Sequence, residues 1–344
     1  MMKALMKKTR GPDGVALENI PEPSPKPGEI KVKVHATGIC GTDLHIIHDE
    51  YHNELPVVMG HEYSGIVVDV GENVAGFQVG DRVVSLTSVV TCGNCIYCRQ
   101  GLLALCGQRK SLGVRVNGAF AEYTVVPAKI AYRVPENVSL DEATMLEPLA
   151  CVVRCVMERG KVGAGDYVLV SGPGTIGMLA MQVARACGGI VVMTGTSRDA
   201  DRLKLAKELG ALDAVNVEDS DAKKRLLELT KNRGFDVAIE CAGAAASFNF
   251  CVQTLRKQGL LIQVGLFGKP VEADLDSLLI KEINYTNGFG AEPTSMEIAL
   301  HLLEHGMVDV KPLISNKIPI DHWREAIRLA EQKVGYKTLI VPNV

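Results

Sequence analysis

The most constraining feature of this sequence is an alternation of strand-like and helix-like segments between residues 166 and 265. Short runs rich in Val, Ile and Leu alternate with amphipathic segments of helical length. This pattern is typical of βαβ units and predicts a parallel, doubly wound sheet. The expected strands are residues 166–172, 190–195, 214–217, 235–243 and 260–265, and the expected helices are 175–188, 200–210, 221–232 and 245–259.

Residues 172–177 read Gly-Pro-Gly-Thr-Ile-Gly and connect the first expected strand of this region to its first helix. In this context the pattern G-x-G-x-x-G is typical of a dinucleotide-binding turn, whose glycines let the backbone approach a pyrophosphate at the helix N-terminus. A glycine-rich turn with a purely structural role is the alternative. The residues predicted to bind the cofactor here are Gly172, Gly174, Thr175, Ile176 and Gly177, together with Val264, Gly265 and Leu266 at the end of a later strand.

The end of the strand expected at 190–195 bears on which dinucleotide binds. NAD-binding proteins usually have an acidic residue there, whose carboxylate binds the ribose, whereas this chain has Gly195. Because the carboxylate is missing, there is room for a 2′-phosphate, and we expect NADP(H). NAD(H) is the alternative if Asp199 or Asp201 reaches the ribose. The residues expected to favour NADP(H) are Gly195, Ser197, Arg198 and Arg202.

The first 140 residues have a different character, with short β-like runs broken by Gly and Pro. The segment 30–39 alternates apolar and polar residues. A helix with a cap-like Ser139 and an acidic first turn is expected over 139–160, interrupted at Pro148. After about residue 288 the pattern is mixed. The sequence therefore predicts an α/β protein in which a mostly-β region accompanies the doubly wound domain.

Four of the ten cysteines lie within one short segment, spaced as Cys-x2-Cys-x2-Cys-x7-Cys. These spacings let a single loop close around a tetrahedral zinc ion, and four thiolates leave no open position for chemistry. We therefore expect a structural zinc site; a zinc ribbon that binds nucleic acid is the rival interpretation. The predicted ligands are Cys92, Cys95, Cys98 and Cys106.

The overall charge argues against the zinc ribbon. The formal net charge is −3, and the sequence has no basic stripe, so neither nucleic acid nor an anionic membrane is an expected partner. No apolar stretch approaches the length of a membrane span. The basic N-terminal residues are not followed by an apolar segment, so we expect no signal peptide and a cytoplasmic location.

A second set of metal-binding residue types is spread along the chain. Cys40 follows a strand-like segment, His61 and Glu62 come about twenty residues later, and Glu147 lies in a Leu-Glu-Pro-Leu segment. Together they offer sulfur, nitrogen and oxygen donors, a set that can hold zinc and leave a position open for water or substrate. For Glu147, an acid in the first turn of a helix is the structural alternative.

These residues lie in recognisable motifs. The chain resembles the zinc-dependent medium-chain alcohol dehydrogenases, in the branch of sorbitol (polyol) and L-threonine 3-dehydrogenases. The resemblance rests on Gly-Ile-Cys-Gly-Thr-Asp-Leu-His, Gly-His-Glu-Tyr-Ser-Gly, the four-cysteine segment, Glu-Pro-Leu-Ala and the glycine-rich turn. It implies a GroES-like, mostly-β catalytic domain, formed by residues 1–153 and 289–344, around a Rossmann domain at 154–288.

The resemblance also implies roles for individual residues. Cys40, His61 and Glu62 match the catalytic zinc ligands, and Glu147 matches a glutamate that holds the zinc water or joins the coordination shell. Thr42 and His45 match a relay that carries the alcohol proton to solvent; a surface imidazole is the alternative for His45. Two zinc ions per chain and a homotetramer, or else a dimer, are implied.

The expected reaction is the reversible, NAD(P)-linked oxidation of a secondary alcohol to a ketone in a polyol or a similar small substrate. Residues 286–291 contain no arginine, where polyol enzymes have an Arg–aromatic pair. Threonine 3-dehydrogenation and 2,3-diol dehydrogenation are therefore alternatives. A zinc-free quinone reductase and a non-catalytic relative are the alternatives from other classes, and both are disfavoured by the intact metal-binding residues.

Overall fold

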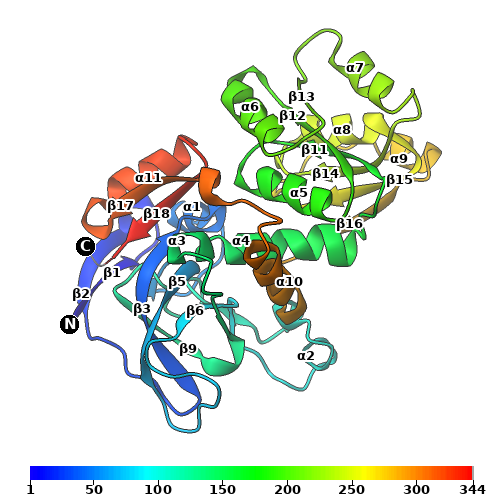
Figure 1. Ribbon diagram of the computed structural model, residues 1–344. Coiled ribbons are helices and arrows are strands. Elements are labelled where there is room, and N and C mark those ends of the chain that lie inside the picture. Colours follow the sequence, from blue (N-terminus) through cyan, green and yellow to red (C-terminus); the bar gives the residue numbers. More distant parts are fainter. Residues whose placement is uncertain (343–344) are drawn as a thin grey trace. The chain divides into compact units, whose positions relative to one another are not determined.

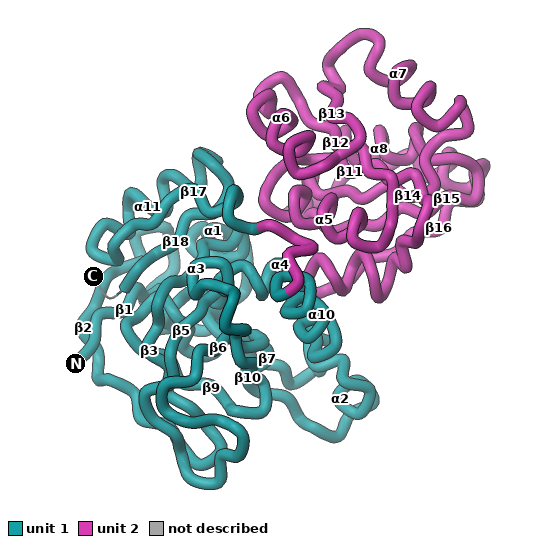
Figure 2. Tube along the Cα trace, viewed as in Figure 1, with its two compact units in different colours: residues 1–150, 290–304, 310–344 teal, residues 151–289, 305–309 magenta. Residues whose placement is uncertain are grey.

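The computed structural model describes residues 1–342 and divides into two compact units (Figure 1). Figure 2 shows unit 1 in teal and unit 2 in magenta. Unit 1 contains residues 1–150, 290–304 and the described residues from Val310, and unit 2 contains residues 151–289 and 305–309. The chain thus leaves the first unit, builds the second and returns to the first.

Unit 2 is built on a six-stranded parallel sheet with the strand order β13-β12-β11-β14-β15-β16. This order confirms the predicted doubly wound sheet. The inner strands are buried along nearly their whole length, which explains why they read as continuous apolar runs. The strands are β11 (Tyr167–Ser171), β12 (Ile190–Gly195), β13 (Asp213–Asn216), β14 (Phe235–Glu240), β15 (Leu255–Gln263) and β16 (Asn284–Asn287).

Helices alternate with these strands along the chain. Helix α5 packs on β11 and β12, α6 on β12 and β13, and α8 on β14 and β15 (Figure 1). Their apolar side chains and those of the sheet form a core that includes Leu169, Val192 and Phe235. The helices are α5 (Thr175–Ala186), α6 (Ala200–Glu208), α7 (Ala222–Leu229), α8 (Ala245–Thr254) and α9 (Leu275–Ile280).

Unit 1 is mostly β. Its largest sheet runs β10-β6-β5-β3-β18-β17, with β9 also paired to β3, and joins the first part of the chain to its last strands. Strand β3 alternates buried and more exposed residues, so one face packs on the core. Its strands are β1 (Met2–Lys7), β2 (Val15–Ile20), β3 (Glu29–Gly38), β4 (Val57–Val58), β5 (Glu62–Val70), β6 (Arg82–Ser85), β7 (Ser88–Val90), β8 (Lys110–Ser111), β9 (Tyr123–Pro127), β10 (Ala131–Arg133), β17 (Ile314–Pro319) and β18 (Lys337–Val341).

Unit 1 contains short helices in its first part and two longer helices near the C-terminus. They are α1 (Gly41–Ile47), α2 (Ile96–Arg99), α3 (Leu140–Ala143), the beginning of α4 (Leu146–Val153), α10 (Pro293–Glu304) and α11 (Trp323–Glu331). Helix α4 continues into unit 2 and is followed by a π-helix over Arg154–Arg159.

Two helix predictions are wrong in detail. The helix expected over 245–259 ends at Thr254, because β15 starts at Leu255 and pairs with β14. Pairing within the sheet here overrides the helix propensity of Lys257 and Gln258. The helix expected over 139–160 is interrupted between α3 and α4, before Pro148, which lies in the first turn of α4, where proline is tolerated.

Candidate active site and zinc centres

Three metal-binding side chains converge in unit 1. The donor atoms of Cys40, His61 and Glu62 all lie within 4.8 Å of one another. Cys40 follows β3 and is the N-cap of α1, whereas Glu62 is the first residue of β5 and pairs across the ladder with Gly38. His61 and Glu62 are buried. The two strands and one helix therefore place a thiol, an imidazole and a carboxylate so that they can share one zinc ion.

Asp43, which the sequence analysis did not single out, orients this group. One carboxylate oxygen accepts a hydrogen bond of 2.9 Å from the backbone N–H of Cys40. The other faces Nδ1 of His61 at 3.6 Å, and neither of these two buried atoms has a hydrogen-bond partner among the described residues. A carboxylate behind a histidine is a common second layer around zinc because it fixes the orientation of the ring. The side chains present therefore fit a bound zinc ion.

Lys337 is the second residue that the sequence analysis missed. Its ammonium group donates to Oε2 of Glu62 at 2.6 Å and to the carbonyl of Ile39 at 3.2 Å. Burial lowers the pKa of Lys337, but the charges of Glu62, Cys40 and Glu147 outweigh this and raise it. A Cβ on Gly38 would lie 2.5 Å from Oε2 of Glu62, so glycine is needed there to make room for the pair.

The other predicted active-site residues lie on α1 and α4. Thr42 and His45 are three residues apart in α1 and therefore share a helix face. Nδ1 of His45 is 2.6 Å from Oε2 of Glu50, a residue that the sequence analysis did not name. Glu147 is half-buried in the first turn of α4, and its charge reaches Lys337, but it is not part of the cluster of three donors.

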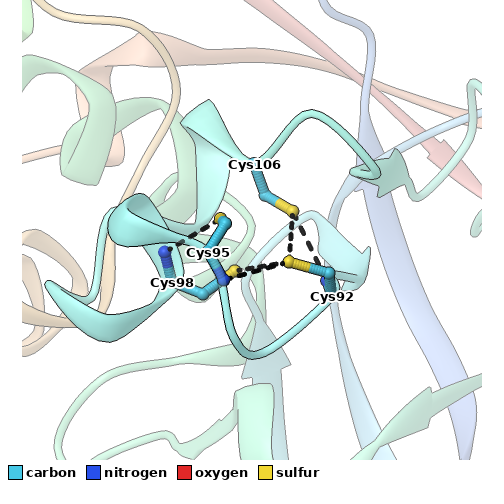
Figure 3. A group of neighbouring side chains, drawn as sticks. All are labelled: Cys92, Cys95, Cys98 and Cys106. Carbon is cyan, nitrogen blue, oxygen red and sulfur yellow. Dashed lines mark hydrogen bonds between the residues drawn. The ribbon is translucent and has the colours of Figure 1, made fainter.

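The four clustered cysteines form a second group of donors in unit 1, with all four sulfur atoms within 4.8 Å of one another (Figure 3). Backbone N–H groups of Asn94 and Cys95 lower the pKa of Cys92 to about 6, whereas burial raises the pKa of Cys98 to about 11. Thiolates are the form that binds metal, and hydrogen bonds from N–H groups stabilise them. This donor set, too, fits zinc.

Glu292 binds the part of this loop that lies between Cys98 and Cys106. Its buried carboxylate accepts hydrogen bonds from the backbone N–H groups of Leu103 at 2.7 Å and Ala104 at 3.1 Å, just before Cys106, the last of the four clustered cysteines. The last third of the chain thereby fixes the loop of the four cysteines. Glu292 carries no sequence signal of its own, since it stands outside every metal-binding pattern.

The glycine-rich turn lies at the carboxyl end of β11 in unit 2, as predicted. A Cβ on Gly174 would meet nothing within 4 Å, so there is open space over the first turn of α5. Gly265 and Leu266 approach this edge of the sheet: a Cβ on Gly265 would lie 2.5 Å from the backbone nitrogen of Gly243. An open backbone surface at a helix N-terminus fits a pyrophosphate.

The end of β12 lies directly beside this turn. A Cβ on Gly195 would be 2.9 Å from Cγ of Pro173 and 3.1 Å from Cβ of Asp199. Arg198 is exposed, and Arg202 lies on α6 with Nη1 3.8 Å from the carboxylate of Asp199. That carboxylate already accepts hydrogen bonds from the N–H and hydroxyl groups of Thr196.

Comparison with known families agrees with this geometry. Residues 26–136 match the alcohol dehydrogenase GroES-like domain, and residues 175–305 match the zinc-binding dehydrogenase domain. The sorbitol dehydrogenase of Halalkalibacterium halodurans is 40% identical over 342 residues, which cover 99% of each chain. The chain belongs to the zinc-binding alcohol dehydrogenases. The family prediction from the sequence motifs is thus confirmed.

Solved dehydrogenase structures share the fold over the whole chain. A zinc-binding dehydrogenase from Sinorhizobium meliloti 1021, bound to NADP, is 31% identical with a TM-score of 0.90, and 99% of each chain is covered. A structure described as a short chain alcohol dehydrogenase from E. coli CFT073, in complex with NADH, is 30% identical with a TM-score of 0.88, and 99% of each chain is covered. Both forms of the cofactor therefore occur among these relatives.

For this zinc-binding alcohol dehydrogenase, the predicted GroES-like and Rossmann architecture and the predicted class of enzyme are confirmed. Within residues 1–342, no helix combines the length and apolarity needed to cross a membrane. None of the ten cysteines, all of which lie within the described residues, forms a disulfide bond.

Proposed function

We propose that this enzyme reversibly oxidises a secondary alcohol of a polyol to a ketone and passes the hydride to NADP⁺ in preference to NAD⁺. The observation that carries the proposal is the cluster of Cys40, His61 and Glu62, with Asp43 and Lys337 behind it. Three protein ligands are typical of a catalytic zinc site, which keeps a position open. The similarity to a sorbitol dehydrogenase supports a polyol as the substrate.

Cys40, His61 and Glu62 would hold the catalytic zinc, and Glu147 would hold a water beside it or join the ligands. The ion, when bound, supplies a Lewis acid that lowers the pKa of the substrate hydroxyl. Asp43 keeps the imidazole of His61 in one orientation. Lys337 compensates the charge of Glu62 and holds this carboxylate at the edge of the site.

Thr42 and His45 would carry the alcohol proton towards solvent. The hydroxyl of Thr42 can accept one proton and donate another, and so can the ring nitrogens of an imidazole. Glu50 accepts from Nδ1 of His45, so Nε2 is the nitrogen left to exchange a proton. The other observation in support is the spacing of Thr42 and His45 on one face of α1.

The NADP(H) preference is supported by the absence of a side chain at Gly195 and by the cations Arg198 and Arg202 beside it. A like charge at position 195 would oppose a 2′-phosphate, whereas guanidinium groups bind phosphate well. NAD(H) is a second candidate because Glu218 contacts Ser197 at the same edge of the sheet. The pyrophosphate would lie on the turn formed by Gly172, Gly174, Thr175, Ile176 and Gly177, with Val264, Gly265 and Leu266 nearby.

The four cysteines of the second cluster would hold a structural zinc, which makes two zinc ions per chain. We also infer that the catalytic domain comprises residues 1–153 and 289–344, and the cofactor domain residues 154–288. A reducing compartment such as the cytoplasm is consistent with ten cysteines that form no disulfide bond.

A homotetramer, or else a dimer, is proposed from the exposed edge of unit 2. Strand β16 is the last strand of its sheet, and Leu279 and Ile280 on the preceding helix α9 are about three-quarters exposed, at 75% and 74%. An unpaired strand edge beside exposed apolar side chains favours association with a second copy. Light scattering on the purified protein measures the assembly directly.

The proposal is tested by metal analysis and by a substrate panel. We expect two zinc ions per chain and the highest kcat/KM on a polyol with NADP. The panel contains polyols, 2,3-diols and L-threonine, each with both cofactors. Turnover confined to L-threonine or to a 2,3-diol would replace the polyol assignment, and a single zinc per chain would contradict one of the two sites.

A further inference from the structure

Strand pairing in unit 2 brings a carboxylate from a neighbouring strand to the end of β12. Gly195 and Asn216 are paired in the parallel ladder between β12 and β13. Because parallel strands end at the same edge of a sheet, the residues two positions further on, Ser197 and Glu218, also meet. The backbone N–H of Ser197 donates to Oε2 of Glu218 at 3.0 Å, and the Ser197 hydroxyl donates to the same oxygen.

Asn216 holds this contact in place. Its amide nitrogen donates to the Ser197 hydroxyl oxygen at 3.1 Å, and its amide oxygen accepts from the backbone N–H of Glu218 at 3.1 Å. The hydrogen bonds from Ser197 and the charge of Arg198 lower the pKa of Glu218, so the carboxylate is ionised at neutral pH. An anion thus occupies both donors of Ser197.

We infer that Glu218 determines which cofactor binds. Its carboxylate weakens the binding of the 2′-phosphate of NADP(H) but does not oppose the binding of NAD(H). The inference rests on the proposed function, which puts the adenosine ribose at the end of β12. The 2′-phosphate needs the N–H and hydroxyl donors of Ser197, and both are bound to Glu218.

Two consequences follow from the chemistry of the ribose. With NADP(H), Glu218 must leave Ser197, because two anions cannot accept from the same donors and repel each other there. With NAD(H), the carboxylate can stay and accept a hydrogen bond from a ribose hydroxyl. Glu218 therefore does from β13 what an acid at position 195 would do from β12.

The two other acids at this edge do not take this role. Asp199 is bound by the N–H of Thr196 at 2.9 Å and its hydroxyl at 2.8 Å, with Arg202 close by. Asp219 accepts from Asn216 at 2.9 Å, and among the described residues the hydrogen bonds of Ser197 go to Glu218 and Asn216. Among Asp199, Glu218 and Asp219, it is therefore Glu218 that accepts from the N–H and hydroxyl groups of Ser197, the donors that a phosphate would need.

The experiment measures the binding of two cofactor fragments, 2′,5′-ADP and 5′-AMP, to the full-length, zinc-loaded enzyme by calorimetry. They differ only in the 2′-phosphate. Glu218→Gln keeps the length of the side chain and an acceptor for Ser197 but removes the charge. We expect this variant to bind 2′,5′-ADP about tenfold more tightly, because one like-charge contact is removed, with 5′-AMP changed by less than about twofold.

Asp219→Asn is the matched control, since it removes a charge from the next residue without touching Ser197, and we expect both fragments to bind it as they bind wild type. In steady-state kinetics, the NADP/NAD ratio of kcat/KM should rise about tenfold in Glu218→Gln alone. An unchanged affinity for 2′,5′-ADP, an equal gain for 5′-AMP, or the same gain in the Asp219→Asn control overturns the role of Glu218. If neither fragment binds wild type, the proposed cofactor site fails and the inference fails with it.

Discussion

Removal of Lys337 gives the sharpest test of the catalytic zinc site. Its ammonium group and the Glu62 carboxylate are 2.6 Å apart, with side chains only 7% and 2% exposed. Removing one partner of such a buried pair leaves an uncompensated charge, which costs about 3–5 kcal/mol. We therefore expect Lys337→Met to lower the free energy of unfolding of the metal-free protein by this amount.

The loss should be smaller when zinc is bound. A metal cation beside Glu62 compensates the carboxylate, and what is lost is mainly a hydrogen bond between charged groups, about 1.5–3 kcal/mol. By linkage, a mutation that harms the metal-free form more than the zinc form must tighten zinc binding. The two losses differ by about 1.5–2 kcal/mol, which corresponds to roughly 10- to 30-fold in affinity for zinc.

Urea unfolding with and without a chelator, and competition for zinc against a colorimetric chelator, measure the two effects. Lys317→Met is the control, because Lys317 pairs with Asp141 at 2.7 Å but is 47% exposed, and such surface pairs contribute about 0–1 kcal/mol. An equal loss of stability in both metal states, or weaker zinc binding by Lys337→Met, would refute the reasoning.

Four further variants probe the other sites. Cys40→Ser should abolish turnover and leave the fold and one zinc per chain, as measured by metal analysis and circular dichroism; normal turnover would contradict the ligand role. Cys98→Ser should lose the other zinc, and a loss of about 3 kcal/mol would lower Tm by roughly 6–12 °C in calorimetry; an unchanged Tm with one zinc missing would contradict a structural site. Glu292→Gln should cost about 1.5–3 kcal/mol and speed the release of that zinc to a chelator, because two N–H groups lose a charged acceptor. Gly195→Asp combined with Arg198→Ala should reverse the cofactor preference in steady-state kinetics, by about one to two decades in the kcat/KM ratio; a wild type that prefers NAD would contradict this.

The sequence predicted the parts of the site that lie in short motifs. The four cysteines lie within one loop, so their spacing alone indicated zinc. Cys40 and His61 lie in local motifs, and the resemblance that these motifs carry predicted them as ligands. Lys337 could not be found in this way, because it is 275 residues from Glu62 and reaches it only through the pairing of β18 with β3. A lysine in a strand has the same sequence signal whether it is exposed or buried.

Asp43 is an intermediate case. It lies within the motif Gly-Thr-Asp-Leu-His, and a charged residue that α1 buries completely is a signal for a functional role. Yet its orientation towards His61 depends on the turn from β3 into α1, which spacing does not predict. The inner strands β11, β12 and β14 were predictable because they are buried along nearly their whole length. The start of β15 was not, because its first residues resemble a helix, and the mostly exposed edge strand β16 was not predicted at all.

The end of β12 shows why the residue at one position and the fold around it must be considered together. Read alone, Gly195 indicates room for a phosphate. In the structure, the space that a side chain there would need is taken by Pro173 of the glycine-rich turn, at 2.9 Å from a Cβ. An acid at position 195 therefore requires Pro173 to shift, whichever cofactor is bound. The neighbouring strand can supply a carboxylate to the same place. Asn216 of β13 pairs with Gly195, and two residues later Glu218 accepts a hydrogen bond from Ser197. Cofactor selectivity at this edge is accordingly a balance between two cations that follow β12, Arg198 in the next turn and Arg202 on α6, and the Glu218 carboxylate that follows β13.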